Sequence, residues 1–479
     1  MKADCCVPSV PHHGSFETFG TAVSAWAERL SAGLSRSVQA SDHTLGHLEE
    51  EILHQTHEVE RALLTEVAQQ KADATPPVCP VCGHKLTRRT RGHERTYQTR
   101  FGPITLRRLR GWCRRCRQWS FPADHALGVA DTGGASPAVQ ELAALAVSKM
   151  PVAEAGAVLE RMAGVKLPRA TLDREARRQG RRAERERTQR DQQMRTAEGV
   201  QQSVPERQRV GPREPFTLVI EMDAWNIRER DAWGQTEARR AAGEEPSRWH
   251  WVYGGTCFRL SQRVQTEGGR SLILSRGTVM TRGGVDALKE QLWAEAMRHG
   301  LAEASAVVVI GDGAVWIWHA SDDRFAGARQ RLDPWHAVQH LWAVARVLYP
   351  DDETAALAWV TPVKEKLLSD AGVEVITDLS AVLEHLRGAK RKAVEAERHY
   401  LETHRGRLDY ADARRRGEPQ GSGAMESTCR QYQCRFHRPG QFWSRTGDEA
   451  LLCLETFWRN GRWRVLFPHV PPTFDPSRN

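Results

Sequence analysis

The sequence predicts a multidomain protein of the mixed α/β class. Its 479 residues exceed the roughly 150 residues of an average domain, so two to four domains are expected. Apolar residues recur at helical spacing through much of the first 180 residues, whereas short apolar β-runs alternate with helical stretches after residue 216. Hydrophobic residues make up 40% and charged residues 27%, which excludes a disordered chain, a collagen and a disulfide-stabilised miniprotein.

The N-terminal region, residues 1–74, is predicted to be helical. Apolar side chains lie on one broad face of residues 16–34 and again of residues 45–67. The second stretch is long enough to self-associate, and a helical hairpin packed on the next domain fits the pattern equally well. Thr75-Pro-Pro77 then ends the helical pattern.

Four cysteines lie in residues 75–130, as Cys79-Pro-Val-Cys82 and Cys113-Arg-Arg-Cys116. Two such pairs offer four thiolates for a tetrahedral, structural Zn²⁺ site, because each pair can chelate one face of the ion. Short β-runs before and after Gly102-Pro103 fit a zinc ribbon with a hairpin between the two pairs. Disulfides are the alternative, disfavoured in a cytoplasm, and His84 or His93 is an alternative ligand.

Positive charge is concentrated in the same segment. The whole chain carries +9, but residues 79–120 hold eleven arginines and one lysine against the single acid Glu94, so the rest of the chain is almost neutral. An arginine-rich composition would spread the excess, whereas a concentrated excess is typical of a polyanion-binding surface. The DNA-contacting candidates in this segment are Arg88, Arg89, Arg91, Arg107, Arg108, Arg110, Arg114 and Arg115.

Residues 131–182 resemble a helix-turn-helix, a DNA-binding motif. Ser136 precedes Pro137 as a helix cap, Met150-Pro151 ends that helix, and residues 163–168 form a turn between two further helices. Arg169 and Arg174 are the DNA-contacting candidates here, with a solvated helix face as the alternative. Residues 183–214 are polar and predict a helical or flexible charged linker.

An α/β domain with a mixed sheet is predicted from residue 215 to the end, interrupted by helices. The first part, residues 215–336, holds β-runs that end at Asp223, Asp312 and Asp333. Residues 337–415 show only helical spacing and predict a helical insertion. Residues 416–479 return to the core with a helix that begins after Gly421-Ser-Gly423 and a final helical section.

Three acids are candidates for one oxygen-rich site. Asp223 and Asp312 each follow a predicted strand, where ligands of α/β sheets bind, and Glu426 falls in the first turn of a predicted helix. Three carboxylates from such positions suit Mg²⁺ or Mn²⁺. Each acid alone also fits a turn or helix cap, and Glu221 and Asp231 are the alternatives to Asp223.

Several motifs together resemble bacterial insertion-sequence transposases of the DDE type, close to the ISKra group. The similar segments are Gly311-Asp-Gly-Ala-Val-Trp-Ile-Trp-His319, Leu332-Asp-Pro-Trp-His-Ala-Val-Gln-His-Leu341 and Gly421-Ser-Gly-Ala-Met-Glu-Ser427. Asp223-Ala-Trp225 matches less tightly, because the family often has Gly where Ala224 stands. The resemblance spans residues 75 to 465 and implies an RNase H-like catalytic core with a helical insertion.

The resemblance also implies the roles of particular residues. Asp223, Asp312 and Glu426 become a catalytic triad that binds magnesium or manganese, while Asp333 and His336 become secondary candidates that position a metal ligand or the scissile phosphate. Arg430 follows Glu426 by one helical turn and is expected to orient it or to contact DNA phosphate. Four tryptophans (Trp335, Trp342, Trp443 and Trp458) are expected in the core rather than stacked on bases.

The expected function is therefore DNA transposition. The resemblance implies double-stranded DNA partners, namely transposon terminal inverted repeats and target DNA, and a homodimer that cleaves and joins strands. No apolar run approaches the ~20 residues of a membrane span, and no signal segment is recognised, so we expect a cytoplasmic, nucleoid-associated protein without a membrane partner. The alternatives are a catalytically silent, domesticated DNA-binding protein and a nuclease without strand transfer.

Overall fold

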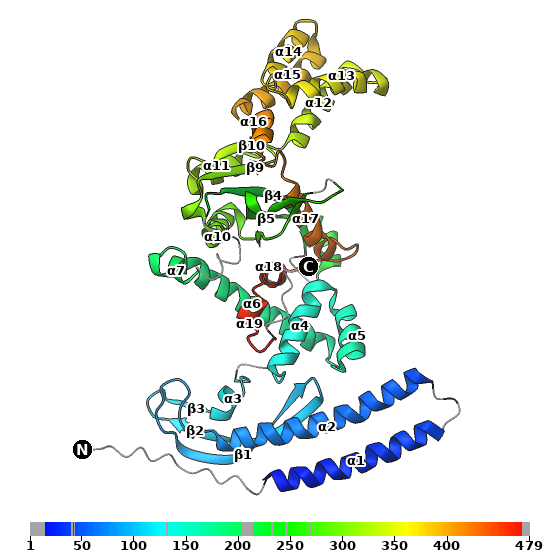
Figure 1. Ribbon diagram of the computed structural model, residues 1–479, viewed down its shortest axis with the longest axis vertical. Coiled ribbons are helices and arrows are strands. Elements are labelled where there is room, and N and C mark those ends of the chain that lie inside the picture. The colour runs from blue at the N-terminus through cyan, green and yellow to red at the C-terminus, as the bar shows by residue number, and fades with distance from the viewer. Residues whose placement is uncertain are drawn as a thin grey trace, which may run out of the picture. The chain divides into compact units, whose positions relative to one another are not determined.

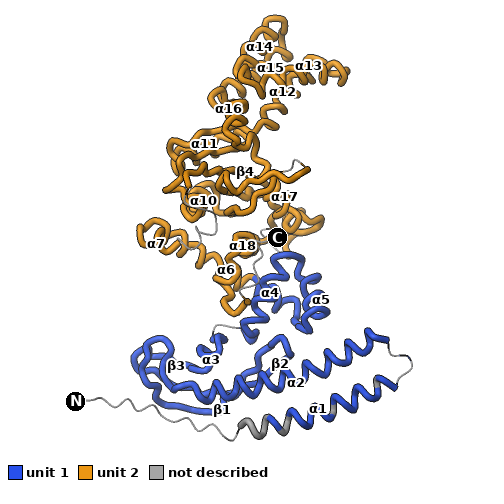
Figure 2. Tube along the Cα trace, in the orientation of Figure 1, with its two compact units in different colours: residues 1–176 blue, residues 177–479 orange. Residues whose placement is uncertain are grey.

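The computed structural model describes residues 15–39, 42, 44–130, 133–203, 214–230, 234–244, 248–268 and 271–471. The chain divides into two compact units, Met1–Ala176 and Arg177–Asn479, each of which we describe by itself (Figure 2). The structure is mixed α/β, as predicted. Asp231 and residues 204–213 of the predicted linker lie outside the described residues.

Two long helices begin the first unit. Helices α1 (Ser15–Gln39) and α2 (Leu45–Ala74) lie side by side as a hairpin (Figure 1). The C-terminal half of α2 packs on a β-sheet, where its Ala68 joins a core of Tyr97, Ile104, Leu106 and Val129. A helical hairpin packed on the next element was one of the two sequence-based alternatives.

A three-stranded antiparallel sheet follows, which we call the basic sheet. It consists of β1 (Thr87–Thr99), β2 (Gly102–Cys113) and β3 (Gln118–Ser120), and helix α3 (Pro122–Ala126) comes after it. Thr99 pairs with Gly102, so the hairpin turns at Arg100 and Phe101, before the predicted Gly102-Pro103 turn. Both strands are longer than predicted, because residues 87–96 carry too few apolar side chains to show the alternation of a half-buried strand.

Three helices complete the predicted helix-turn-helix region: α4 (Pro137–Lys149), α5 (Val152–Ala163) and α6 (Arg169–Gln193). The predicted cap is confirmed, since Ser136 Oγ accepts a hydrogen bond of 3.3 Å from the Val139 N–H. Gly164 ends α5 in the left-handed region at φ 63°, which suits glycine. Helix α6 runs past the predicted end and takes in residues 183–193 of the predicted linker, with α7 (Ala197–Gln202) beyond it.

A five-stranded mixed sheet forms the centre of the second unit. Its order is β10-β9-β4-β5-β8, in which β4, β9 and β10 are parallel while β5 runs antiparallel to both β4 and β8. The strands are β4 (Thr217–Glu229), β5 (Arg248–Arg259), β8 (Gly277–Thr281), β9 (Ala306–Gly311) and β10 (Arg329–Leu332).

Residues 271–281 form two separate strands. The first, β7 (Ser271–Ile273), pairs with β6 (Arg263–Gln265) in a small ribbon, and only β8 joins the central sheet. A bend at Leu274-Ser275 separates β7 from β8. Helix α9 (Thr236–Ala241) and the short 3-10 helix η1 (Leu260–Gln262) complete this region.

Helices cover both faces of the central sheet. Adjacent residues of β5 point to opposite faces: a Cβ on Gly254 would meet Met425 of α17 (Gly423–Phe436), and one on Gly255 would meet Leu292 of α10 (Gly284–Arg298). The α10 face also carries α11 (Val315–Arg324), with η2 (Leu301–Glu303) after α10. Helices α18 (Arg445–Arg459) and α19 (Trp463–Leu466) end the described chain, α18 packing beside β8.

The predicted helical insertion is helical in the structure. Between β10 and α17 the chain forms α12 (Pro334–Leu348), α13 (Glu353–Leu367), α14 (Glu374–Glu384), α15 (Gly388–Thr403), η3 (Arg405–Arg407) and α16 (Tyr410–Arg415) (Figure 1). Leu341, Leu379 and Val394 are buried here in the same hydrophobic cluster as the sheet residue Ile220. Among the described residues, no helix is long and apolar enough to cross a membrane.

Candidate functional site

The four predicted metal-ligating cysteines converge. The sulfur atoms of Cys79, Cys82, Cys113 and Cys116 all lie within 4.8 Å of one another, with Cys79 and Cys116 3.9 Å apart and Cys82 and Cys113 3.5 Å apart. Sulfurs about 2.3 Å from a tetrahedral Zn²⁺ are about 3.8 Å from each other, whereas a disulfide needs about 2.05 Å. All four thiols are free. The group can therefore hold a metal ion such as zinc.

Local hydrogen bonding already favours a thiolate at this group. The backbone N–H of Cys116 donates to the sulfur of Cys113 at 3.4 Å, and this bond, with weaker contributions from Cys82 and Cys79, lowers the pKa of Cys113 to about 7. The pKa of Cys116 is raised by the neighbouring thiols and burial. A thiolate rather than a thiol is the form that ligates zinc. His84 and His93 lie outside the group, so the four-cysteine prediction is preferred over a histidine ligand.

Most of the predicted DNA-contacting arginines around the basic sheet are exposed. Exposed side chains are those of Arg88, Arg89, Arg91, Arg107, Arg114 and Arg115, and, in the helical region after the sheet, Arg169 and Arg174. Arg110 is half-buried, its guanidinium stacked 4.2 Å from the ring of Trp119. These positions leave the exposed arginines available to a polyanion.

The prediction that Arg108 contacts DNA is wrong. Its side chain is buried and donates to Asp124 at 2.6 Å, and Tyr97 OH donates to the same carboxylate at 3.0 Å. Arg108 faces inward because it follows Ile104 and Leu106 at alternate positions of β2. It is therefore a structural residue whose partner, Asp124, lies just beyond the basic segment.

We expect Arg108→Ala to destabilise the first unit by about 3 kcal/mol, because the buried Asp124 carboxylate then keeps the Tyr97 hydrogen bond but has only Arg95, 3.4 Å away, as a cationic partner. The matched control is Arg107→Ala, since Arg107 is 76% exposed and makes only a 3.6 Å ion pair with exposed Glu94. Arg107→Ala should lower the free energy of unfolding by less than about 1 kcal/mol but should weaken DNA binding. Urea unfolding and DNA titrations measure the two effects, and equal stability losses would contradict the assignment.

Three aspartates lie at equivalent positions along three neighbouring parallel strands: Asp223 is within β4, and Asp312 and Asp333 come one residue after the ends of β9 and β10. Glu221 pairs with Ile310 and Leu332 pairs with Gly311, so continuing both registers sets Asp223, Asp312 and Asp333 side by side across β4, β9 and β10. Neighbouring strands are about 4.8 Å apart, and residues in register point to the same face. We call these residues the aspartate row.

Asp223 differs from the prediction in one respect, because it is not at the end of its strand. β4 continues to Glu229 through its pairing with β5, but its pairing with β9 stops at Glu221. Asp223 therefore lies where the parallel neighbour has ended, which leaves its side chain accessible although the strand goes on. Asp223 Oδ1 accepts from the Ala224 N–H at 2.7 Å, and Asp312 Oδ1 accepts from the Ala314 N–H at 2.9 Å.

The carboxylates of Asp223 and Asp312 interact electrostatically. Burial and then the charge of Asp312 raise the pKa of Asp223 to about 6, although the Ala224 N–H opposes the shift. Two like charges held together in a partly buried place are unfavourable without a cation. This local repulsion indicates a site that favours positive charge.

Glu426 comes to the same face on helix α17. It lies in the first turn of that helix, as predicted, and is half-buried. The buried thiol of Cys429, one turn further on, is a donor to Asp223, and its pKa is raised by burial, by Asp223 and, more weakly, by Glu426. Arg430 is exposed and lies 3.5 Å from Glu426, which fits the predicted orienting contact.

Asp333 makes structural hydrogen bonds to the starts of two helices. One carboxylate oxygen accepts from Trp335 N–H at the start of α12, and the other accepts from the N–H and hydroxyl of Ser422 at 2.7 and 2.9 Å. A Cβ on Gly421 would stand 2.8 Å from this carboxylate, so the close approach requires glycine. Burial would raise the pKa of Asp333, but the contact with His336 and these hydrogen bonds lower it.

Glu221 of strand β4 holds the same helix. It is fully buried, and its carboxylate accepts from the Met425 N–H at 2.7 Å. Burial raises the pKa of Glu221 to about 8 even though this hydrogen bond opposes the shift. Glu221 and Asp333 together fix the start of α17, and with it Glu426.

His336 lies beside the aspartate row. Its Nδ1 is 3.6 Å from Asp333, too long for a hydrogen bond but close enough for an ion pair. Asp333, then Asp312 and Asp223 more weakly, raise the pKa of His336 against the opposing effect of its burial. The side chain is thus a cationic neighbour of the acids whenever it is protonated.

The helical insertion contacts the Asp312 loop directly. Tyr400 of α15 donates its hydroxyl hydrogen to the Asp312 carbonyl at 2.9 Å, and its ring stacks on His340 of α12 with centroids 3.6 Å apart. Gly313, at φ 100°, lies so close that a Cβ would meet the tyrosine hydroxyl. The insertion therefore holds the backbone at Asp312.

Sequence reasoning missed the residues that support the site. Glu221 was only an alternative to Asp223, and Ser422, Cys429 and Tyr400 had no assigned role. The neighbouring glycines were the available signal for Ser422, whereas nothing local indicates that α15 returns to Asp312. Trp335 is 64% exposed, so its predicted core position is wrong, whereas Trp443 is buried as expected.

The acids do not form a closed ligand cage. Among the described residues, the four cysteines are the one group of three or more His, Cys, Asp or Glu side chains whose ligand atoms all lie within 4.8 Å of one another. Compared with models of known protein families and with curated proteins, the sequence matches none.

We expect Asp223→Asn to stabilise the metal-free protein. Because the pKa of Asp223 is raised, the charged carboxylate lowers the free energy of unfolding. This loss is complete above pH 6, the pKa in the folded state, and disappears below about pH 4, the pKa in the unfolded state. The variant should therefore gain about 1–3 kcal/mol at pH 8 and almost nothing at pH 4. Thermal unfolding in EDTA at both pH values measures the gain, and a loss at pH 8 would contradict the electrostatic assignment.

Proposed function

We propose that this protein is a DNA transposase that cleaves and joins DNA strands at a DDE site resembling that of the ISKra group. The observation that carries the proposal is the register of the sheet: Asp223 and Asp312 occupy equivalent positions on neighbouring strands, and α17 brings Glu426 to the same face. These are the three acids that the motif resemblance assigns to the triad.

The architecture of the second unit supports the proposal. Strands β10, β9, β4 and β8 run in one direction and β5 runs antiparallel between β4 and β8; with helices on both faces, this sheet agrees with an RNase H-like core. The helices α12–α16 stand between β10 and α17, where the resemblance implies an insertion. The hydrogen bond from Tyr400 to Asp312 gives that insertion a physical role in the site.

The acids suit a divalent cation. Asp223, Asp312 and Glu426 would hold Mg²⁺ or Mn²⁺, oxygen-preferring ions that stabilise the developing charge of a phosphodiester under attack. The raised pKa of Asp223 supports this assignment, because a cation relieves the repulsion between Asp223 and Asp312. Glu221 and Asp333 hold Glu426 in place through α17, and Cys429 donates to Asp223.

The first unit would bind the DNA ends. Exposed arginines around a four-cysteine, zinc-ribbon-like group and the α5–α6 helix pair are features suited to the phosphate backbone and the major groove. Arginine-to-phosphate contacts release counterions, so binding should weaken steeply with salt.

A catalytically silent DNA-binding protein is the second candidate. The observation that favours it is that the three acids do not bring their ligand atoms within 4.8 Å of one another, among the described residues. In this case the basic surface would keep its role, and the second unit would serve as a scaffold.

One assay separates these functions. The full chain is incubated with linear DNA carrying the sequences that flank its gene, with Mg²⁺, Mn²⁺ or EDTA, and the products are resolved on denaturing gels. A transposase gives metal-dependent cuts at the ends and joined products in added target DNA. Cuts without joined products identify a nuclease, and specific binding without cuts identifies the silent DNA-binding protein.

A further inference from the structure

Helix α2 carries a stripe of exposed apolar side chains. Leu45 is 72% exposed, Ile52 46%, Leu63 39% and Val67 54%. Thr56 and the exposed Ala74 continue the stripe. We call the six positions 45, 52, 56, 63, 67 and 74 the α2 stripe.

The stripe follows an 11-residue repeat. Its spacings are 7, 4, 7, 4 and 7 residues, and at about 100° per residue they stay within a sector of about 60° on the helix. Eleven residues in three turns is close to the period of an undistorted α-helix, so such a stripe remains straight along one side. Over positions 45–74 it is about 44 Å long.

Other positions of α2 contact the rest of the first unit. Ala68 and Leu64 pack on the basic sheet, Trp26 of α1 donates to the Gln55 carbonyl, and Arg161 of α5 pairs with Glu50. None of the stripe residues belongs to a hydrophobic cluster of the described residues. The exposed side chains elsewhere on the helix, such as His54, Glu58 and Asp73, are mostly polar, so the stripe is its exposed apolar side.

We propose that the α2 stripe is the interface of an antiparallel homodimer, in which it pairs with the same stripe of a second copy. An antiparallel two-fold axis between positions 59 and 60 pairs 45 with 74, 52 with 67 and 56 with 63. Leucine then faces alanine, isoleucine faces valine and threonine faces leucine. Large and small side chains alternate across the contact, which fills it evenly, whereas a parallel pair would set Leu45 on Leu45 and Ala74 on Ala74.

Charge and area agree with a second copy as the occupant. Exposed Glu49 and Lys71 lie on the same flank of the stripe near its opposite ends, so antiparallel pairing brings Glu49 of each copy toward Lys71 of the other, whereas parallel pairing does not. Glu60 lies on this flank beside the axis, so its two copies approach each other and offset part of this attraction. A contact about 44 Å long between two helices buries roughly 1,000 Å² in total, the lower end of specific interfaces. We therefore expect dissociation constants on the order of micromolar.

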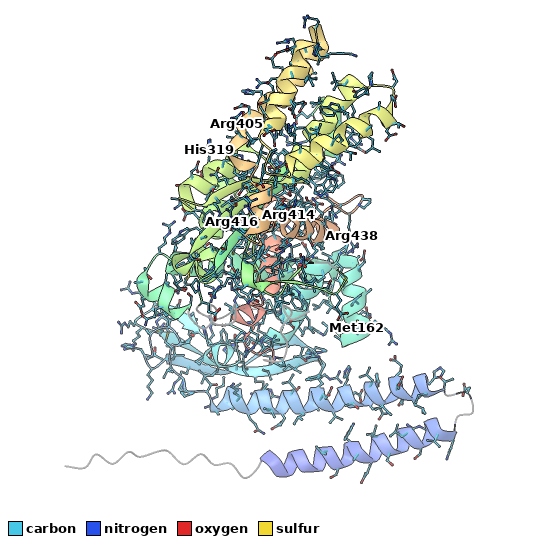
Figure 3. All side chains as sticks on the ribbon, turned by 45° about the horizontal axis from the view of Figure 1, so that its top comes forward. Met162, His319, Arg405, Arg414, Arg416 and Arg438 are labelled. Atoms are coloured by element: carbon cyan, nitrogen blue, oxygen red, sulfur yellow. The ribbon has the colours of Figure 1, made fainter. Side chains whose placement is uncertain are left out.

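The first test is the mass of the full chain in solution. Sedimentation equilibrium at 1–50 μM, as an order-of-magnitude range around that affinity, should show a monomer–dimer equilibrium that Ile52→Glu and Leu63→Glu each weaken more than tenfold. The matched control is His54→Glu, because His54 is exposed on the same helix but lies on the side opposite the stripe. A second control is Met162→Glu on α5, 82% exposed (Figure 3). A monomer throughout, or equal weakening by a control, overturns the proposal.

The second test addresses orientation by charge exchange. Ile52→Lys and Val67→Glu should each weaken the dimer, and the double variant should recover at least half of the lost affinity, because antiparallel pairing sets position 52 opposite 67. Circular dichroism spectra equal to that of the parent chain verify that each variant is folded. A double variant that dimerises no better than the single variants overturns antiparallel pairing.

Discussion

Asp312→Asn should abolish metal-dependent DNA cleavage, with a loss of at least about a thousandfold, or about 4 kcal/mol of transition-state stabilisation. The amide keeps the shape of the side chain and can still accept the Ala314 hydrogen bond, so only the negative charge is removed. The neighbouring Asp223 would retain its position on β4. The measurement is the single-turnover cleavage rate on end-sequence DNA in Mg²⁺.

The matched control is Asp351→Asn, an exposed aspartate in the turn between α12 and α13. It should cleave at the parental rate. DNA affinity should be the same for both variants, because neither residue belongs to the basic surface of the first unit. A normal cleavage rate for Asp312→Asn would show that Asp223, Asp312 and Glu426 are not the catalytic site.

Cys113→Ser should release the metal from the first unit and weaken DNA binding by at least about tenfold. Cys113 is fully buried and supplies one of the four sulfurs, and the three that remain cannot close a tetrahedral site. Since metal binding and folding of such small groups are coupled, the basic sheet should loosen and its arginines lose their fixed arrangement. Metal content, amide exchange over residues 79–120 and DNA titrations report each step.

Cys434→Ser provides the control, because Cys434 is an exposed free thiol far along the chain on α17. It should keep both the metal and the DNA affinity. Unchanged metal content in Cys113→Ser, or unchanged DNA affinity after complete metal loss, would contradict the role assigned to the cysteine group.

The features that could be predicted from the sequence are those that depend on residues close together in the chain. The two pairs of cysteines, the Ser136-Pro137 helix start and the acids after apolar β-runs depend on neighbours within a few residues, and the structure places them as such patterns require. The extension of β4 beyond Asp223 was not predicted. Nothing in the local sequence marks the point at which β9 stops pairing with β4 while β5 continues.

The features that the sequence conceals depend on long-range partners. Arg108 is one of many arginines in its segment, and only its contact with Asp124 on helix α3 distinguishes it as buried. From the sequence Asp333 is a secondary candidate for the catalytic site, and nothing near it indicates that Ser422, 89 residues later, donates hydrogen bonds to its carboxylate. Tyr400 reaches Asp312 across 88 residues for the same reason. Such pairs become visible only when the sheet and the insertion are assembled.

The central claim is that Asp223, Asp312 and Glu426 share a divalent cation. It is tested most directly by replacing that cation with Fe²⁺ in the full chain and adding ascorbate and peroxide, so that hydroxyl radicals cut the backbone near the bound iron. The account predicts cuts close to residues 223, 312 and 426 that excess Mg²⁺ suppresses and that are lost in Asp312→Asn. Cuts absent from all three places, or unaffected by Mg²⁺ and by the substitution, would contradict it.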